Sequence, residues 1–102
     1  MGKLNAVHGH ELYMSGGVNA ARNVLLKTFD NIISGHSHIV QSYPMKDLDG
    51  NIYMSYKTGC LCQLKPRYSP VNSWQHGMAI IEIENNGDFH VENKMIHNGK
   101  VY

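Results

Sequence analysis

Hydrophobic residues recur with the period of an α-helix directly after Asn19. They fall at i, i+3, i+4 and i+7 in Ala21, Val24, Leu25 and Thr28, which places all four on one helix face. Asn19 can cap this helix, because its side-chain oxygen can accept a hydrogen bond from a free N–H group of the first turn. The pattern therefore predicts a helix over residues 20–27 with one face turned to a core.

Two short apolar segments flank this helix, residues 3–7 before it and residues 31–34 after it. A strand, a helix and a strand in so short a stretch predict a βαβ unit, whose two strands run parallel. Open α/β sheets bind their ligands at the carboxyl ends of the strands. We therefore expect His8 and His36 to lie just beyond the ends of neighbouring strands.

After His38 the pattern changes to short alternating segments separated by Asn-Gly and Asp-Gly turn signals, which favour antiparallel hairpins. The strands expected there cover residues 39–43, 51–56, 77–84, 89–96 and 100–102, with an irregular loop over 65–73. The predicted fold class is α/β, a βαβ unit followed by mostly antiparallel strands.

A chain of 102 residues is sufficient for one small domain with a modest core. Its net charge of +1 provides no basic face for binding nucleic acid or an anionic membrane, although an active site can still hold one phosphodiester of a nucleic acid. No apolar run approaches the roughly 18 residues of a membrane span, and no signal-peptide pattern opens the chain. We therefore expect a cytoplasmic protein with no membrane partner.

The two cysteines, Cys60 and Cys62, are separated by one residue. In an extended segment both thiols point to the same side, so the pair can supply half of a zinc site. Such a site normally takes a second cysteine pair, and the chain has none. The favoured interpretation is a pair of buried free thiols.

Histidines are clustered at both predicted strand ends, in His8-Gly9-His10 and in Gly35-His36-Ser37-His38. Glycine permits the sharp turn that leaves a strand, and neutral imidazole is a common metal ligand. Two imidazoles one residue apart would each need a hydrogen-bond partner in a core. We therefore predict metal ligation by His36, His38 and His8, whereas His10 is equally well explained as an ordinary turn residue.

These two clusters resemble the last two of the five motifs of calcineurin-like metallophosphoesterases. The intervening Ser15-Gly16-Gly17-Val18-Asn19-Ala20-Ala21-Arg22-Asn23 is similar to the segment found there in a phage and bacterial branch of that family. Further resemblance comes from Tyr68-Ser69-Pro70 and Ser73-Trp74-Gln75-His76, so the likeness covers nearly the whole chain.

The resemblance implies a two-layer β-sandwich, flanked by helices, that holds two divalent metal ions (manganese, zinc or iron). By motif, His8 and His36 would bind one ion and His38 the other, with His10 close to the reacting groups. The implied reaction is hydrolysis of a phosphomonoester or phosphodiester, including nucleic acid, by a metal-activated hydroxide.

The family's first three motifs, which supply its carboxylate and asparagine ligands, have no counterpart here. Residues 1–102 are therefore expected to form a single partial domain, the C-terminal half of the sandwich. Three imidazoles carry no negative charge to offset two dications, so this segment alone is expected to bind at most one ion and to be inactive. Asp88-Phe89-His90 and Asp47-Leu48-Asp49-Gly50 are better explained by hairpin turns than by metal ligation.

Two further residues are candidates for binding substrate. Arg22, near the start of the predicted helix, can hold a phosphate or can simply be solvated. His76 can reach a substrate cleft or can pack on Trp74.

Two other interpretations of the whole chain stay open. It can be a non-catalytic binding or scaffold module, or one chain of a split enzyme. Half a sandwich leaves strand edges exposed, so it should self-associate or bind a chain that carries the missing motifs.

Overall fold

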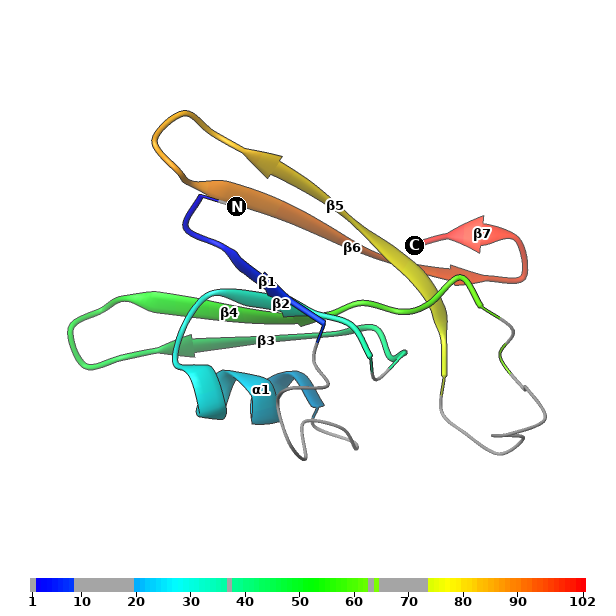
Figure 1. Ribbon diagram of the computed structural model, residues 1–102, viewed down its shortest axis with the longest axis horizontal. Helices are drawn as coiled ribbons and strands as arrows, with labels where there is room; N and C mark the ends of the chain where they lie inside the picture. Colours follow the sequence, from blue (N-terminus) through cyan, green and yellow to red (C-terminus); the bar gives the residue numbers. More distant parts are fainter. Residues whose placement is uncertain (1, 9–19, 37, 63, 65–73) are drawn as a thin grey trace.

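The computed structural model describes residues 2–8, 20–36, 38–62, 64 and 74–102. It is a mixed α/β structure with one short helix and two sheets (Figure 1). In chain order the elements are β1 (Asn5–Val7), α1 (Ala20–Thr28), β2 (Ile32–Ser34), β3 (Gln41–Lys46), β4 (Ile52–Lys57), β5 (His76–Ile83), β6 (Phe89–His97) and β7 (Lys100–Val101). The mixed α/β class predicted from the sequence is thus confirmed.

The first sheet has the strand order β1-β2-β4-β3. β1 and β2 pair in parallel with α1 between them in sequence, which confirms the βαβ unit. The predicted antiparallel pairing of β3 with β4 is also confirmed. On its other side, however, β4 pairs in parallel with β2, with Ser34 opposite Lys57. The mostly antiparallel pattern predicted after His38 named no parallel partner for β4. Three parallel strands therefore end side by side, where the βαβ prediction gave two.

Helix α1 covers the first sheet and packs against β4 and β3 (Figure 1). Its buried residues are Ala20, Ala21, Val24 and Leu25, which include three of the four that the periodicity predicted. Thr28 is half-buried and donates a hydrogen bond from Oγ1 to the carbonyl oxygen of Val24. The helix ends at Thr28, and the next residue, Phe29, has a positive φ of 49°, outside the helical range. Asn19, the predicted cap, lies outside the described residues.

The second sheet is a ribbon of two hairpins, β5-β6-β7. β5 and β6 pair from His76 opposite Ile96 to Ile83 opposite Phe89. Both predicted Asn-Gly turns are present, and Asn98 and Gly99 have positive φ values of 50° and 75°. Two consecutive positive φ values are typical of the tight turn whose twist matches a hairpin.

The two sheets are joined through Asn93 of β6 and through the start of β5. Asn93 Nδ2 donates hydrogen bonds to the carbonyl oxygens of Gln41 and Lys57, which lie on β3 and β4. At the start of β5, Gly77 lies against Gly59 so closely that a Cβ atom on Gly59 would be 2.6 Å from the Gly77 nitrogen. The predicted loop 65–73 lies outside the described residues. In the part of the chain that is described, α1 is too short and too polar to cross a membrane.

Candidate metal centre at the ends of the parallel strands

Metal-ligating residue types follow all three parallel strands at the same sheet edge. His8 comes directly after β1, His36 comes two residues after β2, and Cys60 comes three residues after β4. The backbone joins these exits, because the N–H of Gly35 donates to the carbonyl oxygen of His8 at 3.0 Å and the N–H of Thr58 donates to that of Ser34 at 3.0 Å. This is the edge at which open α/β sheets place their ligands.

His8 and His36 form a close pair, as the βαβ prediction required. His8 Nε2 lies 3.0 Å from His36 Nδ1, and the ring centroids are 4.9 Å apart with the planes inclined by 57°. Both side chains are exposed. Two imidazole nitrogens at this distance can share one proton, or can both turn their lone pairs to one ion.

His36 and His38 both adopt left-handed backbone conformations, with φ values of 67° and 57°. Such values are uncommon for residues other than glycine, and they cluster at functional sites where the surrounding structure enforces them. At His38 the enforcing contact is visible, because its carbonyl oxygen accepts a 2.7 Å hydrogen bond from the N–H of Gln75.

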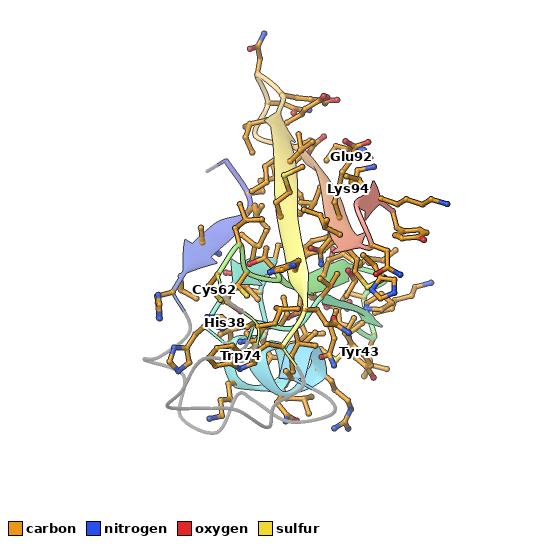
Figure 2. All side chains as sticks on the ribbon, turned by 90° about the vertical axis from the view of Figure 1, so that its right-hand side faces the viewer. His38, Tyr43, Cys62, Trp74, Glu92 and Lys94 are labelled. Carbon is orange, nitrogen blue, oxygen red and sulfur yellow. The ribbon has the colours of Figure 1, made fainter. Side chains whose placement is uncertain are left out.

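His38 is half-buried and lies between Trp74 and Cys62 (Figure 2). Its ring meets the Trp74 ring edge-on, with centroids 4.4 Å apart, and its Nδ1 lies 3.8 Å from Cys62 Sγ. Burial lowers the pKa of His38, and repulsion from His36 and His8 lowers it further. Both effects favour the neutral imidazole, which is the form that binds a metal ion.

Cys60 and Cys62 complete a group of three ligands with His38. The ligand atoms of these three side chains lie within 4.8 Å of one another, and the two Sγ atoms are 2.7 Å apart. The hydrogen bond to Cys60 raises the pKa of the Cys62 thiol, with smaller contributions from desolvation and from the charge of Cys60. The group contains no carboxylate, and among the residues that the structure describes it is the one cluster of at least three such ligands.

The predicted burial of the thiols is wrong, since Cys62 is exposed and Cys60 is half-buried. The reason is the parallel pairing of β4 with β2. It places the segment after β4 at the carboxyl ends of the parallel strands rather than in the core. A sequence signal for this was present. Gly59-Cys60 follows a strand just as Gly35-His36 does.

His76 lies beside the cluster of His38, Cys60 and Cys62 and is hydrogen-bonded to the backbone of Cys62. Its Nε2 makes a 2.7 Å hydrogen bond to the carbonyl oxygen of Cys62. His76 also lines an open cleft of about 600 Å³, and its role in binding substrate stays a prediction. The other residues that line the cleft are Leu64, Trp74, Gln75, Met95, Ile96 and His97. The ring packed against Trp74 is that of His38.

The remaining candidates are less well defined by the structure. Arg22 is exposed on α1. His10 lies outside the described residues, so the substrate-binding role of Arg22 and the catalytic role of His10 stay predictions.

The carboxylate of Asp47 accepts hydrogen bonds from the N–H groups of Asp49 and Asn51, both at 2.9 Å. These bonds agree with the interpretation of this segment as a turn. Desolvation acts to raise the pKa of Asp47, but these bonds and those from the Asn51 and Tyr53 side chains lower it on balance.

The carboxyl edge of the first sheet thus gathers two ligand groups, the pair His8 and His36 and the cluster His38, Cys60 and Cys62. The motifs predicted the pair, whereas the contribution of the cysteines depends on a strand pairing that the motifs do not encode. Comparisons of this chain with family models, with curated proteins and with solved structures found no match.

Proposed function

We propose that this chain supplies the C-terminal half of a calcineurin-like metallophosphoesterase domain, and that the complete domain hydrolyses phosphate esters. One observation carries the proposal: His8 Nε2 and His36 Nδ1 lie 3.0 Å apart just beyond two adjacent parallel strands. The substrate class is a phosphomonoester or a phosphodiester, with nucleic acid among the candidates.

In this proposal His8 and His36 hold one divalent ion, and His38 is available to a second. When bound, such ions supply a hydroxide nucleophile and neutralise charge on the phosphoryl oxygens. In this proposal Arg22, which is exposed on α1, would contact a phosphate, and His76, which lines the cleft, would contact the substrate. His10 lies near the reacting groups by motif alone.

The charge balance requires further ligands. His8, His36 and His38 bring no negative charge as neutral imidazoles, so they cannot by themselves offset two dications. The carboxylates would come from a segment or a chain that carries Asp-x-His and Gly-Asp-x-x-Asp. With the histidines alone we expect at most one weakly bound manganese ion per chain.

Manganese titration followed by NMR tests the proposal, because this paramagnetic ion broadens the resonances of nearby protons. We expect broadening of the His8 and His36 imidazole signals but not of His90, which is exposed on β6. The substitution His36→Gly should abolish broadening at His8. Glycine is chosen because it accepts the φ of 67° at this position. His90→Ala is the matched control and should behave like the unsubstituted protein.

Equal broadening at His8 with and without the His36 imidazole would contradict the proposed ligand pair. Hydrolysis of bis(p-nitrophenyl) phosphate is expected only when a chain with the missing motifs is added. Strong manganese-dependent hydrolysis by this chain alone would overturn the assignment of the carboxylates to another segment. A chain that neither binds manganese nor associates with such a partner would instead favour the binding-module interpretation.

A further inference from the structure

We propose that His38, Cys60 and Cys62 form a separate site for a thiophilic divalent ion, in the first place zinc, with one coordination position left open. The three ligand atoms already lie within 4.8 Å of one another. The proposal goes beyond the phosphoesterase function, in which the two thiols have no part. It competes with that function only for His38, which would bind the thiophilic ion instead of a second phosphoesterase ion, and it leaves the His8 and His36 pair unchanged.

The backbone holds two of the three ligands, His38 and Cys60, together through Gln75. Its N–H donates to the carbonyl oxygen of His38 at 2.7 Å, and its carbonyl oxygen accepts the N–H of Cys60 at 2.9 Å. Its side-chain Oε1 accepts the N–H of Val40 at 2.9 Å. The N–H of Gly77 also donates to the carbonyl oxygen of Cys60 at 3.0 Å. The segments carrying His38 and Cys60 are therefore fixed against the start of β5. The site is therefore organised by the fold rather than by an ion.

Glycine at position 59 permits this arrangement. A Cβ atom there would lie 2.6 Å from both the carbonyl oxygen of Gln75 and the nitrogen of Gly77. Gly77 is equally restricted, since its Cβ would lie 2.6 Å from the carbonyl oxygen of Lys94. Only glycine lets the exit of β4 approach β5 closely enough to set Cys60 beside His38.

Two neighbouring groups orient the ligands. The Nε2–H of His76 donates to the carbonyl oxygen of Cys62 at 2.7 Å, which fixes the turn that carries the exposed thiol. The edge of Trp74 lies against His38, with ring centroids 4.4 Å apart, and limits rotation of the imidazole (Figure 2). Groups that orient ligands in this way commonly change metal affinity by about 10–100-fold. His76 and Trp74 are therefore positioning residues of the site.

The donor set matches the chemistry of zinc. Two thiolates neutralise the charge of the dication, and one imidazole leaves the fourth tetrahedral position to water or to an added ligand. Binding releases the two thiol protons to solvent, forms two metal–sulfur bonds and one metal–nitrogen bond, and changes no oxidation state. Two sulfurs about 2.3 Å from one ion lie about 3.8 Å apart. The sulfurs, now 2.7 Å apart, must separate by about 1 Å on binding, which rotation of the exposed Cys62 side chain allows.

Titration of the reduced protein with Co²⁺ or Cd²⁺ tests the site, because thiolate ligation gives a sulfur-to-metal charge-transfer absorption that imidazole alone does not give. We expect this band in the unsubstituted protein and its reversal by added zinc. Cys60→Ser and Cys62→Ser should each weaken binding by at least about 100-fold, more than the loss of an orienting group. His76→Ala, which leaves all three ligands, should weaken it by about 10-fold.

Control variants separate this site from the histidine pair. His36→Gly should keep the band while losing manganese broadening at His8, and His90→Ala should keep both. Far-ultraviolet circular dichroism of each variant shows whether it is folded. The proposal is overturned if the reduced protein gives no band with excess metal, if either serine variant keeps it in full, or if mass spectrometry finds a disulfide that persists in reductant. None of these results would remove the manganese signal at His8, so the two proposals fail independently.

Discussion

The two sheets of this protein are stabilised in different ways. Among the residues that the structure describes, the buried apolar ones belong to the first sheet and its helix, or lie next to them: Leu4, Ala20, Ala21, Val24, Leu25, Ile32 and Ile33. The β5-β6-β7 ribbon instead exposes large apolar side chains, including Met78, Ile80 and Ile83. The first region is ordered by a core, whereas the ribbon relies on its hydrogen-bond ladder and on its attachments. The candidate metal centre lies where the two regions meet.

The largest difference is expected between one core residue and one ribbon residue. Leu25 is fully buried on α1, so Leu25→Ala should lower the free energy of unfolding by about 2–5 kcal/mol. Ile80 is 44% exposed on β5, and Ile80→Ala should cost less than about 1 kcal/mol. Urea unfolding followed by circular dichroism measures both values. Similar losses for the two substitutions would show that the ribbon has a covered apolar face of its own.

A smaller effect is expected from glycines at the junction. Gly59→Ala places a methyl group 2.6 Å from two backbone atoms and should lower stability by about 1–3 kcal/mol, with loss of the cobalt band. Gly35→Ala is the matched control, because its Cβ would meet nothing nearer than 3.6 Å. Unfolding curves and cobalt titrations of both variants check this expectation. A stable Gly59→Ala protein that still binds cobalt would mean that the two regions can separate without loss of the site.

The smallest effect concerns the far end of the ribbon. Lys3 Nζ lies 2.9 Å from Asp88 Oδ1, and this hydrogen bond lowers the pKa of Asp88, assisted by Asn86 and by the charge of Lys3. A lowered carboxyl pKa contributes stability above the unfolded-state value of about 4, and that contribution is lost as the pH falls through the folded-state value. Because both side chains are largely exposed, the effect should be slight and weakened by salt.

Urea midpoints at pH 7 and at pH 3 check this last expectation. The unsubstituted protein should lose slightly more stability between the two than Asp88→Asn or Lys3→Ala does. An identical pH dependence in all three proteins would show that the ion pair between Lys3 and Asp88 does not stabilise the contact between the chain start and the ribbon.

The sequence predicted what depends on near neighbours. The period of Ala21, Val24 and Leu25 fixed the helix face, and Asn98-Gly99 fixed the last hairpin, because side-chain spacing and turn geometry act over a few residues. The fold class and the meeting of His8 with His36 followed from the short βαβ stretch. The assignment of the His8 and His36 pair to a phosphoesterase site stays a prediction.

What could not be predicted depends on distant pairing. The last residue of β4, Lys57, is fully buried, and its Nζ donates a hydrogen bond to the carbonyl oxygen of Gly35 at 3.1 Å. A lysine at a buried position gives no hydrophobic signal for a strand with neighbours on both sides. The hydrophobic pattern therefore did not indicate the parallel partner of β4. The one local signal for the place of the cysteines was Gly59-Cys60, which follows a strand as Gly35-His36 does.

The hydrogen bonds of Gln75 have a kinetic consequence. The amide protons of Cys60 and Gly77 are bonded to carbonyl oxygens of Gln75 and Cys60 across the contact between β5 and the exit of β4. They exchange with solvent only when this contact opens, so amide exchange at Cys60 would report how often the ribbon detaches at this point.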